Sequence, residues 1–200
     1  MLLMTGRKIV ELGPGEYPMR TRFTSKDYER DRVPIRLRKG EAYYPVDTQV
    51  HLLKRMRENV RSDVEVHPID ANLKSLPLKT GSVDEVHASF IGGMLQVIYK
   101  NTSKEGRGDE KIRPDGSRML AEAHRVLKPR KSLYLHAELP GDEKARAKDI
   151  AQIQKNIAAF GFEPHEKVRI VYSDDGLSVP KSSSGYGKAY TSMVLRFKKK

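Results

Sequence analysis

The chain has 200 residues, of which 38% are hydrophobic and 32% are charged, and it carries a formal net charge of +12. This length and composition predict one globular domain with its own core, and the absence of cysteine excludes disulfides, thiolate metal sites and cysteine nucleophiles. The apolar start, residues 1–4, is too short for a signal peptide, and no apolar run approaches the ~20 residues of a membrane helix. We therefore expect a cytoplasmic protein with no membrane contact.

The first predicted element is a strand that ends in an acid and a glycine turn, at residues 8–15. Gly13 and Gly15 lack a Cβ atom, so the turn can adopt conformations closed to other residues and a ligand can lie against its backbone. Glu11 stands where a carboxylate can meet a polar end of that ligand. By itself, this pattern is equally typical of a tight turn between a strand and a helix.

Strands and helices then recur along the chain. The predicted strands are 41–46, 64–69, 81–90, 132–137, 168–172 and 190–197, and the predicted helices are 48–60, 119–127 and 142–160. Gly161 is expected to end the last helix as a left-handed cap. This order predicts an α/β fold with a doubly wound, mostly parallel sheet covered by helices on both faces. In such a sheet, ligands bind at the carboxyl ends of the strands.

Four segments, taken in order, resemble motifs of the class I S-adenosylmethionine-dependent methyltransferases, over about residues 8–172. Residues 10–15 look like the family's first motif. Asp47 ends the second predicted strand, where the family places an acid on the ribose hydroxyls. Asp70 and Ala71 lie in a segment similar to the family's adenine-binding turn. Residues 81–86 and 122–129 resemble its fourth strand and the end of the following helix.

The resemblance implies S-adenosylmethionine as the cofactor and a sheet of seven strands whose last strand is antiparallel. The cofactor-binding residues that it implies are Glu11, Gly13, Gly15, Asp47, Asp70, Ala71, Ser89 and Phe90.

The chain departs from the family pattern after the first motif. Tyr17 stands near the usual third glycine and Pro18 follows it, which puts a standard loop and helix start in doubt. The segment 19–39 holds eight basic and three acidic residues, unlike an apolar-striped helix. We therefore interpret residues 1–200 as a single methyltransferase-like domain with a basic insertion at 19–40 and polar loops at 99–117 and 174–189.

These three segments are predicted to leave the same edge of the sheet at which the cofactor lies. Loops of this length are more often functional or disordered than idle connectors. Together with the net charge of +12, they favour an anionic partner, and nucleic acid is the commonest polyanion. A solvated basic surface explains the charge equally well, and the methyl acceptor stays open.

Methyl transfer requires a general base only if the acceptor atom starts protonated. His136 and Glu138 alternate on one face at the end of the fifth predicted strand and are the candidates, with structural roles as the alternative. His87 lies within a strand covered on both faces, so we expect a hydrogen-bonded core histidine. No histidine shows metal-ligand spacing, so no metal site is expected.

Two other functions fit parts of the pattern. A nicotinamide-dependent dehydrogenase uses a similar sheet, but the third glycine is missing and Asp47 follows Gly13 by about 34 residues instead of about 20. A catalytically degenerate methyltransferase-like module that binds RNA or another anionic partner is the alternative that is not an enzyme.

Overall fold

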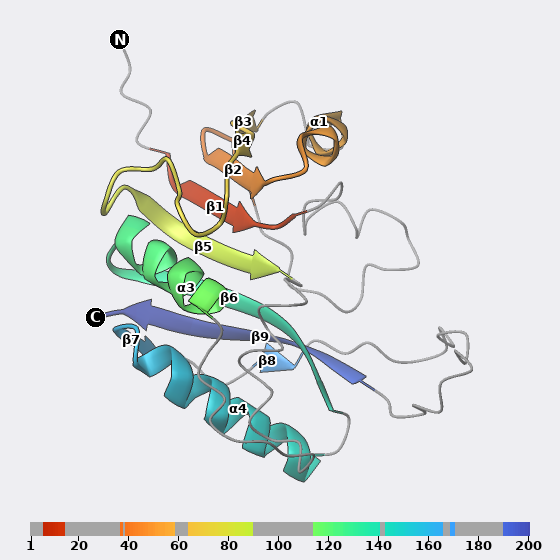
Figure 1. Ribbon diagram of the computed structural model, residues 1–200, viewed down its shortest axis with the longest axis vertical. Coiled ribbons are helices and arrows are strands. Elements are labelled where there is room, and N and C mark those ends of the chain that lie inside the picture. Colours follow the sequence, from red (N-terminus) through yellow and green to blue (C-terminus); the bar gives the residue numbers. More distant parts are fainter. Residues whose placement is uncertain are drawn as a thin grey trace, which may run out of the picture.

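The computed structural model describes residues 6–14, 37, 39–58, 64–89, 114–140, 143–165, 169–170 and 190–200, which form a twisted sheet flanked by helices (Figure 1). The strands are β1 (Lys8–Leu12), β2 (Ala42–Asp47), β3 (Glu65–Val66), β4 (Ile69–Asp70), β5 (Val83–Ser89), β6 (Leu127–Pro140), β7 (Phe162–Pro164), β8 (Arg169–Ile170) and β9 (Tyr190–Lys199). The helices are α1 (Val50–Glu58), α3 (Pro114–Val126) and α4 (Glu143–Ala158).

The described strands form one sheet in the order β3-β2-β1-β5-β6-β9-β7, with β4 also beside β2 and β8 also beside β9. Strands β2, β1, β5 and β6 run parallel, and β9 runs antiparallel to β6. Because β3 and β4 share one neighbour and β7 and β8 share another, the segments fill seven positions across the sheet. The predicted mostly parallel sheet with an antiparallel last strand is confirmed.

Because the central strands run parallel, their carboxyl ends lie together on one side of the sheet and their amino ends on the other. The carboxyl ends of β1, β2 and β5 lie at one edge, which we call the carboxyl edge (Figure 1). The starts of β1, β5 and β6 lie at the opposite edge, the amino edge. The antiparallel strand β9 ends there, because its Lys198 is paired with Ser132 near the start of β6.

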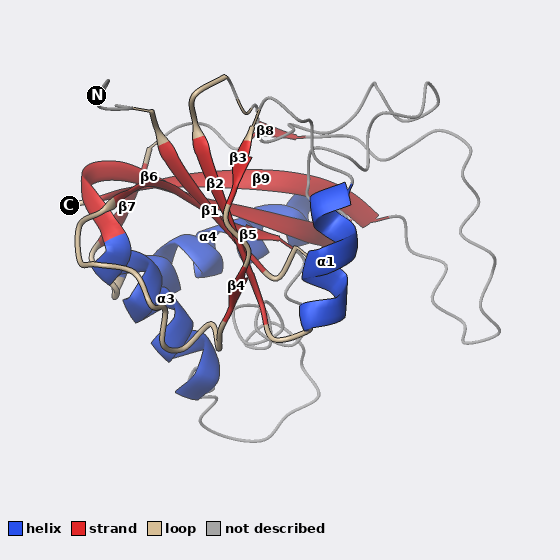
Figure 2. Ribbon diagram, turned by 90° about the horizontal axis from the view of Figure 1, so that it is seen from above, coloured by secondary structure: helices blue, strands red, loops and turns tan. Residues whose placement is uncertain are grey.

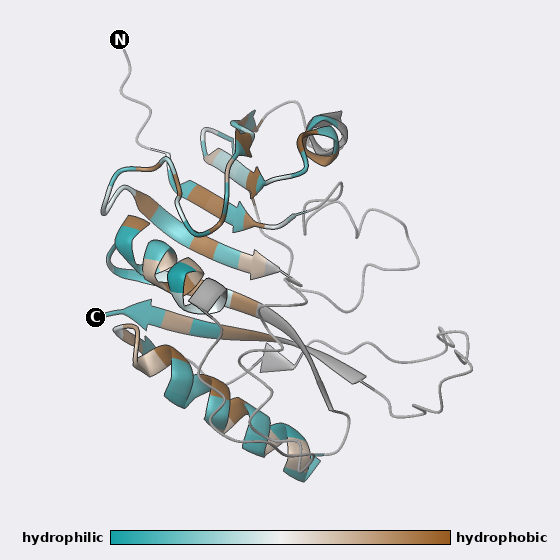
Figure 3. Ribbon diagram, viewed as in Figure 1, coloured by the Kyte–Doolittle hydropathy of each residue, from teal (hydrophilic) through white to brown (hydrophobic). Residues whose placement is uncertain are grey.

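The main core lies between the sheet and helices α3 and α4, which cover one face (Figure 2). Val10 and Leu12 of β1 point into it, as the alternation of side chains along a strand requires. Helix α4 buries Ile153 and Ile157, and Figure 3 shows hydrophobic residues alternating with hydrophilic ones along it. Gly161 then takes φ 81°, so the predicted left-handed residue after this helix is confirmed.

A second, smaller core lies on the opposite face, beneath α1 (Figure 2). Ile9 of β1 and Tyr43 of β2 contribute to it from the sheet, and Leu53 contributes from α1. Helices therefore cover both faces, as predicted. None of the described helices is long and apolar enough to cross a membrane.

Two predicted boundaries in the middle of the chain are wrong. The strand expected at 64–69 is split into β3 and β4, because Pro68 between them has no N–H to donate to a neighbouring strand. Helix α3 begins at Pro114 instead of residue 119, so residues 114–117 of the predicted polar loop are helical. Proline suits the first position of a helix, where its missing N–H would have no partner in any case.

The sheet also extends further than predicted at its other end. Strand β6 runs from Leu127 to Pro140 instead of 132–137, because Leu127 pairs with Val83 across a register shift. Strand β7 was not expected. It is three residues long and forms through its pairing with β9, which the local sequence does not encode.

Candidate functional site

Three residues that the sequence singles out lie side by side at the carboxyl edge. The N–H of Gly13, which follows β1, donates to the carbonyl of Val46 at 2.9 Å, and the next residue of β2 is Asp47. Asp47 is in turn paired in register with Asp70 of β4. The N–H of Ala71 also donates to the carbonyl of Asp47, at 3.3 Å. The register of the sheet thus brings these predicted site residues together.

Glu11 lies fully buried next to this group, 0% exposed. The hydroxyl of Tyr43 donates a hydrogen bond to its carboxylate. Burial, and then the adjacent carboxylate, raises the pKa of Tyr43 well above its ordinary value, so the hydroxyl keeps its proton and stays a donor. Tyr43 therefore fixes the carboxylate that precedes the glycine turn. The two residues are 32 positions apart, and no local sequence signal pairs them.

The turn after β1 depends on glycine. Gly13 takes φ 67°, in the left-handed region that residues with a side chain rarely adopt. It is also partly exposed. A ligand at this edge can therefore approach bare backbone, as the strand-and-glycine pattern predicts.

Helix α3 holds the segment that follows Asp70. The carboxylate of Glu122 accepts the N–H of Leu76 at 2.7 Å, and Arg125 donates to the carbonyls of Leu76 at 2.8 Å and Leu78 at 2.7 Å. Arg125 also binds both carboxylate oxygens of Glu122 at 2.7 Å, and these bonds lower the pKa of Glu122. This Glu122–Arg125 clamp gives a physical role to a helix end that the sequence marked only as a family signature.

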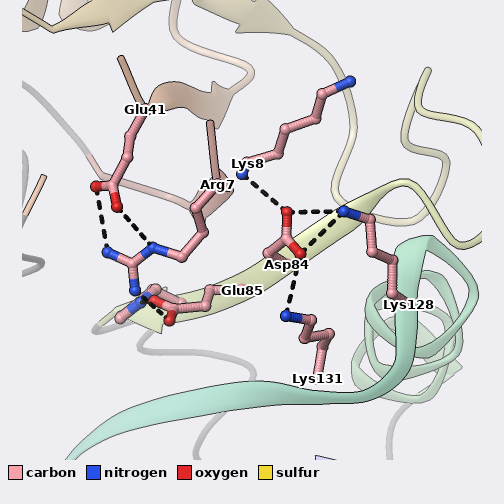
Figure 4. A network of polar contacts seen from close by, with 8 residues as sticks. Arg7, Lys8, Glu41, Asp84, Glu85, Lys128 and Lys131 are labelled. Carbon is pink, nitrogen blue, oxygen red and sulfur yellow. Dashed lines mark hydrogen bonds and ion pairs between the residues drawn. The ribbon is translucent and has the colours of Figure 1, made fainter. Parts of the chain in front are cut away.

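His87 is part of a buried polar cluster. It is 6% exposed, lies 3.3 Å from the carboxylate of Glu85 and stacks on Tyr134 with ring centroids 4.5 Å apart. Burial lowers the pKa of His87, and the neighbouring Glu85 opposes that shift. Figure 4 shows Arg7 between Glu85 and Glu41, with ion pairs to both. The expectation of a hydrogen-bonded core histidine is confirmed.

Three of the remaining candidates lie in β5 and β6. Ser89 ends β5 and is paired with His136 of β6, and Glu138 lies two residues further along β6. The structure describes only the backbone of these three residues. Gly15 and Phe90 lie outside the described residues. The assignments of these five residues stay predictions.

The groups at the carboxyl edge fit the cofactor that the sequence resemblance implies. S-adenosylmethionine carries cationic sulfonium and ammonium groups, and its ribose hydroxyls are hydrogen-bond donors. Glu11, Asp47 and Asp70 supply carboxylate oxygens, which accept such bonds, and Asp70 is exposed to solvent while Asp47 is partly so. Within the described parts of the chain, no three His, Asp or Glu side chains are placed to hold a metal ion.

A family model described as a methyltransferase domain matches residues 32–135, just over half of the chain. A search of curated proteins finds no match.

Solved methyltransferase structures share the fold across nearly the whole chain. A 16S rRNA (adenine(1408)-N(1))-methyltransferase from Catenulisporales acidiphilia, solved with its cosubstrate S-adenosylmethionine, is 16% identical with a TM-score of 0.57, covering 96% of this chain and 85% of that one. A SAM-dependent methyltransferase from Methanosarcina mazei is 14% identical, with a TM-score of 0.52 and coverages of 97% and 92%. One from Thermotoga maritima is 19% identical, with a TM-score of 0.52 and coverages of 100% and 84%.

Proposed function

Because this chain belongs to the class I S-adenosylmethionine-dependent methyltransferases, we propose that it transfers the cofactor's methyl group to an anionic acceptor at the carboxyl edge. The observation that carries this proposal is the adjacency of Gly13, Asp47 and Asp70 beside the buried Glu11. The family match favours methyl transfer over a dehydrogenase and over a degenerate binding module.

Each residue of this group has a proposed role in binding. Glu11, held by Tyr43, places negative charge near the cationic methionine end of the cofactor. Asp47 accepts hydrogen bonds from the ribose hydroxyls, and Asp70 with Ala71 borders the adenine end. Gly13 lets the cofactor lie against the backbone. All of these residues lie at or just after the carboxyl ends of β1, β2 and β4, so the sheet holds them in place.

When bound, the cofactor supplies a methyl group on a positively charged sulfur, which is already an activated donor. The chain has to hold the acceptor atom in line with the sulfur–carbon bond and to exclude water. Transfer would join the acceptor atom to the methyl carbon, and the sulfur would keep the electron pair of the broken bond. An acceptor that starts protonated also releases its proton to a base. His136 and Glu138 near the end of β6 are the proposed candidates for that base.

RNA is the proposed acceptor to test first. The net charge is +12, and segment 19–39 alone carries eight basic residues against three acids. That segment follows β1, whose carboxyl end borders the proposed cofactor site. A protein of similar fold methylates 16S rRNA, and this likeness supports the choice of probe.

Calorimetry with purified protein tests the cofactor site. We expect micromolar binding of S-adenosylmethionine and S-adenosylhomocysteine and no binding of NAD. Asp47→Ala should weaken binding about tenfold or more, since hydrogen bonds to a charged group are worth about 1.5–3 kcal/mol. Gly13→Arg should abolish it. Glu143→Gln, an exposed acid on α4, is the matched control and should bind as the wild type does.

Unchanged affinity in both site variants would refute the residue assignments. Transfer of a radiolabelled methyl group to total cellular RNA tests the acceptor. Transfer to protein or small-molecule fractions alone would refute RNA as the acceptor and leave the cofactor site standing.

A further inference from the structure

Basic side chains gather at the amino edge of the sheet, opposite the proposed cofactor site. Lys8 begins β1, and Lys128, Arg130 and Lys131 lie at the start of β6. Asp84 contacts three of these residues: the backbone N–H of Lys8 donates to its carboxylate at 3.1 Å, and the Nζ atoms of Lys128 and Lys131 lie 2.9 Å and 3.3 Å from it. We call Lys8, Lys128, Arg130 and Lys131 the basic edge.

The cations of the basic edge are exposed, whereas the acid beneath them is not. The side chains of Lys128 and Lys131 are 41% and 48% exposed, and that of Asp84 is 9% exposed. Lys8 and Arg130 are exposed as well. Figure 4 shows Asp84 between the two lysine ammonium groups. Asp84 offsets one of the four positive charges, so a surplus of three remains on the surface.

Neighbouring acids do not remove this surplus. Glu41 and Glu85 lie nearby (Figure 4), with side chains only 10% and 17% exposed, and both pair with Arg7. These three residues together carry one negative charge, which leaves a surplus of two positive charges. At the end of β9, Lys198 is paired in register with Glu163 of β7. Their opposite charges cancel and do not change the net charge of this edge. Figure 3 colours this end of β9 as hydrophilic.

The backbone conformation of Arg130 independently indicates that its side chain has a functional role. Arg130 takes φ 61°, in the left-handed region, where the Cβ atom of an L residue meets the backbone unfavourably. Every other left-handed residue in the described parts of the chain is a glycine, namely Gly13, Gly40, Gly81 and Gly161. A glycine at this position near the start of β6 would adopt the same φ without strain. The chain instead places an exposed guanidinium there.

We propose that the basic edge binds the phosphate backbone of RNA. Four exposed cations that outnumber the neighbouring acids on one strip suit a polyanion. The guanidinium of Arg130 is a planar fork of donors that matches phosphate oxygens, and the lysines act as point charges beside it. The strained backbone at Arg130 is maintained for this contact.

The basic edge and the cofactor site contact different parts of one RNA. Strand β5 has seven residues, which at about 3.3 Å per residue separate the two edges by about 20 Å. The nucleotide that is methylated at the carboxyl edge therefore cannot occupy the basic edge. The basic edge binds a flanking part of a structured RNA, and this binding needs neither the cofactor nor a particular target atom.

Fluorescence anisotropy with a labelled RNA hairpin of about 30 nucleotides, measured over a salt series, tests the proposal. The test variant combines Lys8→Gln, Arg130→Gly and Lys131→Gln, and it retains the pair of Lys128 with Asp84. We expect its affinity for RNA to fall about tenfold and the slope of log K against log salt to decrease by about 2, since each phosphate contact contributes about 0.7–0.9. The charge-matched control combines Lys144→Gln, Lys148→Gln and Lys155→Gln, all exposed on α4.

Further measurements separate a specific RNA contact from a general effect of charge or of stability. Arg130→Gly alone should weaken RNA binding while its melting temperature equals or exceeds that of the wild type, because the strain is relieved. Equal losses in the test variant and the α4 control would overturn the proposal, since net charge alone would then explain binding. Loss of binding to anionic lipid vesicles, with RNA affinity unchanged, would overturn it in favour of a membrane. Calorimetry with S-adenosylmethionine should give wild-type affinity in every variant, and its failure in the wild type would count against the proposed function only.

Discussion

Replacing Arg125 by glutamine tests whether helix α3 holds the edge of the proposed cofactor site. Arg125 donates to the carbonyls of Leu76 and Leu78 and to Glu122, with all donor–acceptor distances at 2.7–2.8 Å. Its side chain is 34% exposed, so each carbonyl bond contributes about 1 kcal/mol and the ion pair less than 1 kcal/mol. Arg125→Gln should therefore lower the free energy of unfolding by about 2–3 kcal/mol.

The same change should weaken cofactor binding, because the segment held by Arg125 begins directly after Asp70 and Ala71. If the free segment adopts its binding-competent form only a tenth of the time, the apparent Kd rises about tenfold. Urea unfolding measures the first effect, and calorimetry with S-adenosylmethionine measures the second. Glu122→Gln should have a smaller effect of about 1 kcal/mol, because the amide oxygen still accepts the N–H of Leu76.

Arg118 provides the control for this prediction. It lies exposed on the same helix, and Arg118→Gln removes the same charge, so its effect should stay within about 0.5 kcal/mol. The double variant of Glu122 and Arg125 should lose less than the sum of the single losses, because the two side chains share partners. If Arg125→Gln unfolds and binds cofactor as Arg118→Gln does, the clamp has no role in the site.

Two further predictions concern stability. Gly161→Ala should lower the free energy of unfolding by about 2 kcal/mol, because φ 81° disfavours a side chain and its Cβ atom would lie 2.8 Å from Nε2 of His124. Gly40 has φ 82°, and a Cβ atom added there would have nothing within 4 Å, so Gly40→Ala should lower the free energy of unfolding by only about 1 kcal/mol. Equal losses for the two variants in urea unfolding would show that the contact with His124 has no effect on stability. The second prediction concerns pH: burial lowers the pKa of His87 below that of the unfolded chain, so its neutral form stabilises the fold fully above about pH 6.5. This contribution is lost as pH falls from 6.5 toward the folded pKa, and His87→Gln should flatten the decline in melting temperature between pH 7 and 5.

The sequence predicted the features that depend on local pattern. Alternating and periodic apolar residues gave the order of strands and helices, and the glycine at 161 marked a left-handed cap. It missed features that depend on distant partners. Leu127 extends β6 only because Val83 lies beside it. The donor to Glu11, Tyr43, comes from a different strand, so the contact follows from the register of β1 with β2 and not from either segment alone.

The direction of the parallel strands separates two kinds of charge. At their carboxyl ends the strands and their turns present Glu11, Asp47 and Asp70, which suit a cationic cofactor. At their amino ends, the surface cations outnumber the acid buried beneath them, which suits an anionic polymer. The separation of about 20 Å is twice the Debye length of about 8–10 Å at physiological salt, so charges at one edge hardly influence binding at the other. Variants at the two edges should therefore be additive, and a combined Asp47→Ala and Arg130→Gly protein should show the cofactor defect of the first and the RNA defect of the second, each unchanged by the other.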